Sequence, residues 1–182
     1  MAFSLVSPAL EDGAPMPELF AREGAKVVFG DLLDEAGKQV EEAIRQQGGE
    51  ATYVHLDVTS EADWVEAVGT AVNRYGKLDI LVNNAGISGA RARGEPVHLE
   101  DATEAAWDRV LAVNAKGVFL GTKHAIPAMR QAGGGSIINI SSIAGGGGWF
   151  WAEFWRLRRL QRRGAPVDRV HRDPVRPGWY TV

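Results

Sequence analysis

Residues 78–86 read LDILVNNAG. The run from Leu78 to Val82 is short and largely apolar, which is typical of a buried strand. The small residues that follow, from Asn83 to Gly86, let a flat ligand approach the backbone closely. Ligands of open parallel sheets bind beyond the carboxyl ends of the strands. This segment is therefore a candidate binding edge, although a simple turn would have the same composition.

Outward from this segment, strand and helix patterns alternate along the chain. A first strand is expected over AFSLV at residues 2–6, followed by a helix that starts late, at Pro15 or Pro17, because proline is tolerated in a first turn. The alternation predicts an α/β fold with a parallel sheet, right-handed crossovers and helices on both faces. Further strands are expected over 26–31, 52–58, 78–82 and 136–140, and further helices over 34–47, 61–75 and 102–131.

Two of these helices begin with capping residues. Ser60 is expected to cap the helix over 61–75, with Asp63 at the capping-box position. Asp101, together with Glu104, is expected to cap the long helix that follows the loop over 87–98.

The composition indicates one globular domain in a reducing compartment. The chain has 182 residues, of which 45% are hydrophobic and 24% charged, and its net charge is −3. It has no cysteine, which excludes disulfides, thiol nucleophiles and cysteine-based metal sites, and we expect no metal. The first residues lack the pattern of a signal peptide, and no apolar run approaches the ~18 residues of a membrane span. We therefore expect a cytoplasmic protein with no membrane partner.

Two carboxylates stand at the ends of expected strands. Asp31 could accept hydrogen bonds from the hydroxyls of an adenosine ribose and would repel a 2′-phosphate, which favours NAD over NADP. Asp57 could meet the edge of an adenine ring. Each could instead be an ordinary turn residue, and Asp31 could also be a helix-start residue.

Five segments in order carry a family resemblance. They are ELFAREGAKVVFGD, HLDV, LDILVNNAG, WDRVLAVNAKGVF and GSIINISSIAG, which lie within residues 18–146. This series resembles the short-chain dehydrogenase/reductase family over about seven-tenths of the chain. The resemblance implies a Rossmann-like parallel sheet with flanking helices, incomplete after about residue 146. It implies a dinucleotide-binding domain over 1–146, in which 1–17 are atypical, and an aberrant tail over 147–182 rich in Trp and Arg.

The family resemblance also implies an activity and a set of roles. Members are NAD(P)-dependent oxidoreductases that move a hydride between a secondary alcohol or carbonyl and nicotinamide. Asn114 resembles the asparagine that supports a water and the catalytic lysine, and Ser142 resembles the serine that hydrogen-bonds the substrate oxygen. Asn114 could instead be a polar residue inside a helix, and Ser142 a strand cap. The residues that would bind the cofactor are Gly13, Asp31, Asp57, Val58, Asn84, Ala85 and Gly86.

The proton relay of the family is absent from this sequence. The reaction needs a tyrosine, whose ordinary pKa of about 10 is lowered by a lysine one helical turn away. Four residues after Tyr53 and Tyr75 stand Asp57 and Asp79, and Tyr180 has no residue that far downstream. The tyrosine's expected place falls near Trp155 and Leu157. We therefore expect this chain to be inactive or severely impaired.

The phosphate-binding glycine loop is also altered. The family form T-G-x-x-x-G-x-G, counted back from ELF, falls on Val6, Ser7, Glu11 and Gly13, so only Gly13 remains. Glu11 and Asp12 would place negative charge where the pyrophosphate meets a helix N-terminus.

The tail suggests a shift of reading frame. Residues 149–182 hold eight Arg, three acidic residues and four of the six Trp. A Trp codon read one base later always gives glycine, and codon choice allows residues 155–180 to become GAYAASKGAVRLLTESTAIQYAPDGI. Leu157 then becomes the tyrosine and Gln161 the lysine. We interpret the chain as a family sequence that is truncated or frameshifted at both ends.

The expected partner is a small-molecule alcohol or carbonyl, and no nucleic acid is expected. Intact relatives form homo-oligomers through the helix of Asn114 and the helix after it, which is replaced here, so assembly of this chain is in question. Two other functions stay open: a non-catalytic dinucleotide-binding module, and a basic tail that binds nucleic acid or membrane. An unstructured, functionless tail is the remaining interpretation.

Overall fold

The fold is built on one parallel sheet. The computed structural model of the chain describes residues 2–5, 16–87, 101–140 and 174–175. Their strands follow the order β3-β2-β1-β4-β5-β6, the Rossmann order over the first five positions. β1 to β5 are parallel, and β6 pairs antiparallel with the start of β5. The strands span Ala2–Leu5 (β1), Lys26–Asp31 (β2), Glu50–His55 (β3), Ile80–Asn83 (β4), Gly135–Asn139 (β5) and Pro174–Val175 (β6).

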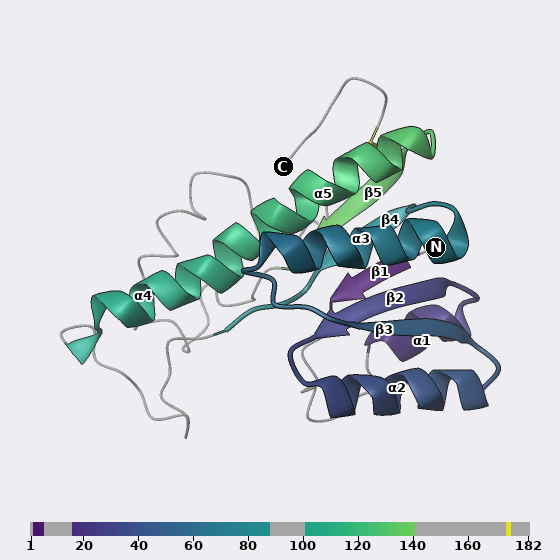
Figure 1. Cartoon of the computed structure of the whole chain (residues 1–182), viewed down its shortest axis with the longest axis horizontal. Helices are drawn as coiled ribbons and strands as arrows, with labels where there is room; N and C mark the ends of the chain where they lie inside the picture. Colours follow the sequence, from purple (N-terminus) through teal and green to yellow (C-terminus); the bar gives the residue numbers. More distant parts are fainter. Residues whose placement is uncertain (1, 6–15, 88–100, 141–173, 176–182) are drawn as a thin grey trace, which may run out of the picture.

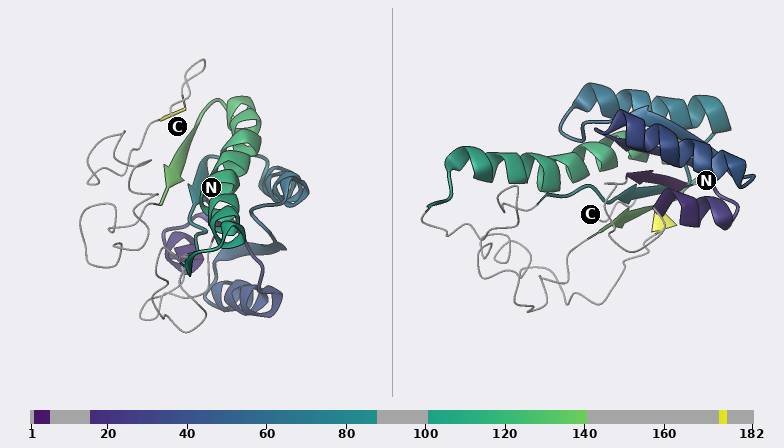
Figure 2. Two further views of the ribbon diagram at one scale, coloured as in Figure 1. Left: turned by 90° about the vertical axis from the view of Figure 1, so that its left-hand side faces the viewer. Right: turned by 90° about the horizontal axis from the view of Figure 1, so that it is seen from below.

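Helices lie on both faces of this sheet. They span Met16–Arg22 (α1), Asp34–Gln46 (α2), Glu61–Tyr75 (α3), Glu104–Leu111 (α4) and Gly117–Gln131 (α5). Figure 1 shows α3 and α5 side by side across the sheet, with α4 extending beyond the carboxyl ends of the strands, and Figure 2 repeats this arrangement from two other sides. The expected α/β fold with a parallel sheet is therefore confirmed.

Alternation along β2 separates two cores. Val28 packs in the larger core with residues of α3 and α5, whereas Val27 and Phe29 pack with residues of α1 and α2. All three side chains are almost fully buried. A strand whose consecutive residues face two cores must be apolar throughout, which is why the run KVVFGD lacks the polar alternation of a half-exposed strand.

The ends of several elements differ from the sequence predictions. The helix over 61–75 is confirmed, and the Ser60 side chain accepts a hydrogen bond from the Asp63 amide. The side chain of Asp63, predicted at the capping-box position, accepts a hydrogen bond from the backbone amide of Asp57 (2.9 Å). The strand predicted over 52–58 ends at His55, because the carboxylate of Asp57 binds the amide and hydroxyl of Thr59 and turns the chain.

The long helix predicted over 102–131 is interrupted, and its predicted cap is wrong. Thr103, not Asp101, caps α4, because the Thr103 hydroxyl accepts from the Ala106 amide at 3.1 Å. A π-helical segment, Ala112–Lys116, separates α4 from α5. The late start predicted for the first helix is confirmed, since α1 begins at Met16 with Pro17 in its first turn.

Close packing between α3, α5 and β4 centres on one indole. Trp64 of α3 is fully buried. Its ring occupies the space that a Cβ on Gly121 of α5 would need, and that Cβ would also lie 2.5 Å from Oδ1 of Asn83. Asn83 donates from Nδ2 to Oδ1 of Asn139 (2.9 Å), which ties β4 to β5. No helix within the described ranges is both long and apolar enough to span a membrane.

Two helical glycines provide a test of this packing. We expect Gly121→Ala to lower the free energy of unfolding by about 1–3 kcal/mol, because the added methyl overpacks against Trp64 and Asn83. Gly69→Ala, in α3, meets nothing within 4 Å and should instead stabilise by up to about 1 kcal/mol through helix propensity. Urea denaturation of both variants measures the difference. Equal effects of the two substitutions would contradict the packing described here.

Candidate functional site

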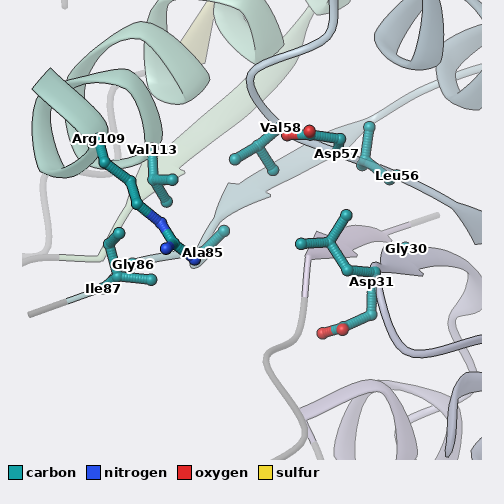
Figure 3. A pocket seen from close by; sticks show the side chains of 11 residues that line it. Gly30, Asp31, Leu56, Asp57, Val58, Ala85, Gly86, Ile87, Arg109 and Val113 are labelled. Carbon is teal, nitrogen blue, oxygen red and sulfur yellow. The ribbon is translucent and has the colours of Figure 1, made fainter. Parts of the chain in front are cut away.

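A pocket of about 140 Å³ lies at the carboxyl edge of the sheet. Three loops and one helical face surround it (Figure 3). Its lining comes from the end of β2 (Gly30, Asp31 and Leu32), the segment after β3 (Leu56, Asp57 and Val58), the segment after β4 (Ala85, Gly86 and Ile87), and from Arg109 and Val113. Apolar walls therefore carry two carboxylates and, among these residues, a single cation.

Asp31 is held by its own turn. One oxygen of its carboxylate accepts a hydrogen bond from the Leu33 amide at 2.9 Å. Figure 3 shows the carboxylate on the far side of the pocket from Ile87 and Arg109. Asp31 can therefore stabilise the turn and bind a ligand at the same time, since its second carboxylate oxygen has acceptor sites of its own.

Asp57 and Val58 form the wall that follows β3. Oδ1 of Asp57 accepts from the Thr59 amide (2.8 Å) and hydroxyl (2.7 Å), so the expected turn role of Asp57 is present. The carbonyl of Val58 accepts a hydrogen bond from the buried indole of Trp64 at 3.0 Å. A Cβ on Gly117 would lie 2.9 Å from the Val58 side chain, so glycine at that position lets the start of α5 approach this wall.

Asn114 fixes the loop after β4 to the π-helical segment. Its Oδ1 accepts from the Ile87 amide at 2.8 Å, and its Nδ2 donates to the Ile87 carbonyl at 2.9 Å. The π-helical turn carries the amide to this position, and its side chain satisfies both backbone groups of one residue. Asn114 therefore does more than fill the helix interior, because it supports the wall formed by Ala85, Gly86 and Ile87.

The structure brings together five of the predicted site residues. Asp31, Asp57, Val58, Ala85 and Gly86 line the pocket, and Asn114 stands behind it. Asn84 is not among the lining residues.

Two predicted site residues, Gly13 and Ser142, lie outside the described residues, as do the rest of the altered glycine loop, the division near residue 146, Trp155 and Leu157. Among the residues that are described, no group of His, Asp or Glu side chains could hold a metal ion.

Sequence reasoning did not identify three of the lining residues that matter chemically. Ile87 directly follows NNAG, and Val113 directly precedes Asn114, so adjacency to both motifs was the available signal. Arg109 precedes Val113 by one helical turn and therefore shares its face. Its guanidinium extends toward the loop of Ala85 and Gly86 in Figure 3.

Comparison with known proteins gives this site a family. The model described as short chain dehydrogenase matches residues 13–154. The chain belongs to the short-chain dehydrogenase family.

Several curated short-chain dehydrogenases are similar to this chain. A 3-alpha-(or 20-beta)-hydroxysteroid dehydrogenase of Mycobacterium tuberculosis is 50% identical over 133 residues, which are 73% of this chain and 48% of the relative. A 2,5-dichloro-2,5-cyclohexadiene-1,4-diol dehydrogenase of Sphingobium indicum is 45% identical over 133 residues, 73% of this chain and 51% of the relative. A trans-4-hydroxycyclohexanecarboxylate dehydrogenase of Sinomonas cyclohexanicum is 48% identical over 139 residues, 73% of this chain and 51% of the relative.

A solved structure supports the same assignment. The crystal structure of a Burkholderia xenovorans protein, assigned to the short-chain dehydrogenases/reductases, matches with a TM-score of 0.68 and 34% identity. The match covers 79% of this chain and 57% of that chain. The present chain spans about half the length of the curated relatives it matches.

The two hydrogen bonds of Asn114 make a local prediction. We expect Asn114→Ala to cost about 1–3 kcal/mol of stability and to accelerate hydrogen exchange of the Ile87 amide by about tenfold or more, because that amide loses its acceptor. Thr103→Ala, which removes the cap of α4, is the control, with a comparable cost of about 1 kcal/mol. It should leave the exchange of Ile87 much less affected. Equal exchange of Ile87 in the two variants would refute the role of Asn114.

Proposed function

We propose that the pocket binds the adenosine part of NAD. The carboxylate of Asp31 at the end of β2 is the observation that carries this proposal, because it can accept hydrogen bonds from both ribose hydroxyls. Apolar side chains of Leu56, Val58, Ile87 and Val113 suit the faces of an adenine ring. At about 140 Å³ the pocket is smaller than the ~300–1,000 Å³ of a whole ligand site, which fits one part of a dinucleotide.

The negative charge of Asp31 also supports a preference for NAD over NADP. A 2′-phosphate would lie beside an ionised carboxylate, and like charges at close range oppose binding. Asp57, the second carboxylate of the pocket, adds to the negative electrostatic potential that a 2′-phosphate would meet there. Arg109 lies on a different wall and is the only cation among the described lining residues, so we do not assign it to a 2′-phosphate.

The reaction class that we propose is hydride exchange between a cyclic secondary alcohol or its ketone and nicotinamide. Curated relatives are named as dehydrogenases of a 3-alpha- or 20-beta-hydroxysteroid, a cyclohexadienediol, a hydroxycyclohexanecarboxylate and cyclopentanol, which are secondary alcohols of cyclic compounds. The bound dinucleotide supplies the hydride chemistry. Asp31 would orient it, while Asn114 keeps the wall of Ala85 and Gly86 in place.

Proton transfer is the step for which this sequence lacks the groups. None of its three tyrosines has a lysine four residues downstream. In the family, a lysine one helical turn beyond the tyrosine lowers the pKa of the phenol so that it can act as a base at neutral pH, and this sequence does not provide that pair. Tyr53, whose pKa is raised by burial and by Asp34, is still less suited to the task. We therefore propose that this chain binds the dinucleotide with little or no turnover, as a cytoplasmic dinucleotide-binding protein.

Titration with reduced cofactors tests the binding proposal. We expect NADH to bind more tightly than NADPH, as measured by the fluorescence of the nicotinamide. Asp31→Asn should reduce the ratio of the two affinities about tenfold or more, because it removes a charged acceptor worth about 1.5–3 kcal/mol. Glu66→Gln on the exposed face of α3 removes the same charge far from the pocket lining and should change neither affinity. A preference for NADPH in the unmodified protein would overturn the assignment of Asp31.

A frame shift in the coding sequence is our proposal for the origin of the Trp/Arg-rich tail. We expect the DNA of codons 150–181, read one base later, to encode YAASK at the position of Leu157 to Gln161. We also expect purified protein to oxidise cyclohexanol with NAD at no more than background rate, and a protein made from the corrected DNA to turn over. Steady turnover by the present chain, free of host enzymes, would contradict the loss of the proton relay. A DNA sequence without YAASK would refute the frame shift.

A further inference from the structure

A chain of hydrogen bonds lies directly behind Asp31. The hydroxyl of Tyr53, on β3, lies 2.7 Å from both the backbone carbonyl of Asp31 and Oδ1 of Asp34, so its single proton is shared between these two acceptors. Nδ1 of His55, also on β3, lies 2.7 Å from the same Asp34 oxygen. Asp34 opens α2, so these side chains connect the strand to the turn between β2 and α2.

Packing holds the tyrosine ring in place. The rings of Tyr53 and Phe29 meet edge to face with centroids 5.7 Å apart. The space beside Gly37 of α2 is occupied by the Tyr53 ring, so any side chain at position 37 would displace it. The hydroxyl therefore reaches the Asp31 carbonyl from a fixed direction.

The charges of the three groups are coupled. Hydrogen bonds from Tyr53 and then His55 lower the pKa of Asp34, which keeps this carboxylate ionised. The hydrogen bond to Asp34 is the main cause that raises the pKa of His55, with smaller contributions from Asp63 and Asp57. Lys38 of α2 also faces Asp34, and the charge of Asp31 acts on Tyr53.

We propose that Tyr53, Asp34 and His55 are positioning residues that hold the Asp31 turn in the form that receives the adenosine ribose of NAD. The turn is fixed at three points: the Asp31 carbonyl by Tyr53, the Asp31 carboxylate by the Leu33 amide, and Asp34 by Tyr53 and His55. A turn that is already ordered lowers the free-energy cost of binding a ligand, because fewer backbone and side-chain torsions lose their freedom on association. This inference rests on the proposed binding of NAD.

Three conservative variants and one matched control test the proposal. Tyr53→Phe removes the hydroxyl but keeps the ring against Phe29, and Asp34→Asn and His55→Gln remove charge at similar size. We expect Tyr53→Phe and Asp34→Asn to raise the Kd for both NADH and ADP-ribose by about three- to tenfold, the range for one net hydrogen bond. Glu42→Gln neutralises an exposed acid further along α2, whose carboxylate is bound by Gln46, and should leave both Kd values unchanged.

The pH profile separates positioning from general stability. Protonated His55 donates a charge-assisted hydrogen bond to Asp34, so this support is complete at low pH and is lost as pH rises through the raised pKa of His55. The Kd for ADP-ribose should therefore rise about threefold from pH 6 to pH 8.5. His55→Gln and Asp34→Asn should flatten this profile, whereas a variant that merely unfolds would shift the whole curve.

Two kinds of failure are distinguishable. Binding of NADH by the unmodified protein with unchanged Kd values in Tyr53→Phe and Asp34→Asn would overturn the positioning role alone. No binding of NADH or ADP-ribose by the unmodified protein would overturn the proposed function and this inference together. Thermal melts of every variant, with midpoints close to that of the unmodified protein, would assign a change in Kd to the turn itself.

Discussion

The burial of Trp64 is the constraint on which the larger core and the pocket both depend. Its ring fills the gap that glycine leaves at position 121, which sets the distance between α3 and α5. Its indole nitrogen cannot be buried without an acceptor, and the Val58 carbonyl supplies one. The same side chain thus completes the hydrophobic core and fixes the wall that follows β3. A smaller residue at position 64 would leave a cavity in the core and would also remove the hydrogen bond that fixes the wall after β3.

Asn114 supports the wall after β4 in the way that Trp64 supports the wall after β3, through a hydrogen bond from a helix side chain to the backbone of the loop. The helix expected through residues 102–131 is interrupted by the π-helical segment where Asn114 meets Ile87. π-Helical turns are less favourable than α-helical ones and persist where other contacts compensate. Here the compensation is a pair of hydrogen bonds to one loop residue. The carboxyl edge of the sheet is therefore formed by loops that contact the helices behind them.

The sequence predicts strands and helices here because their signals are local, whereas the supports of the site are not. The apolar run at Lys26–Asp31 and the Ser60 cap depend on neighbouring residues, and both are confirmed. The supports of the site, by contrast, join residues that are far apart in sequence. They are the packing of Trp64 on Gly121, the contact of Tyr53 with Asp34, and the break in the helix near Asn114. Thr103 caps α4 in place of Asp101 because the two candidates, two residues apart, differ only in where the chain turns.

Dinucleotide binding and proton transfer are separable properties of this architecture. The pocket is built from the ends of β2, β3 and β4 and from the helix of Arg109 and Val113, all within the region of family resemblance. The proton relay of the family would come from residues after 142, where this sequence has no tyrosine with a lysine four residues on. Interactions with the adenosine part stabilise ground state and transition state alike, and they contribute affinity without accelerating chemistry. On our proposal, a chain with the first set of residues and without the second would recognise the dinucleotide but would not catalyse the reaction rapidly.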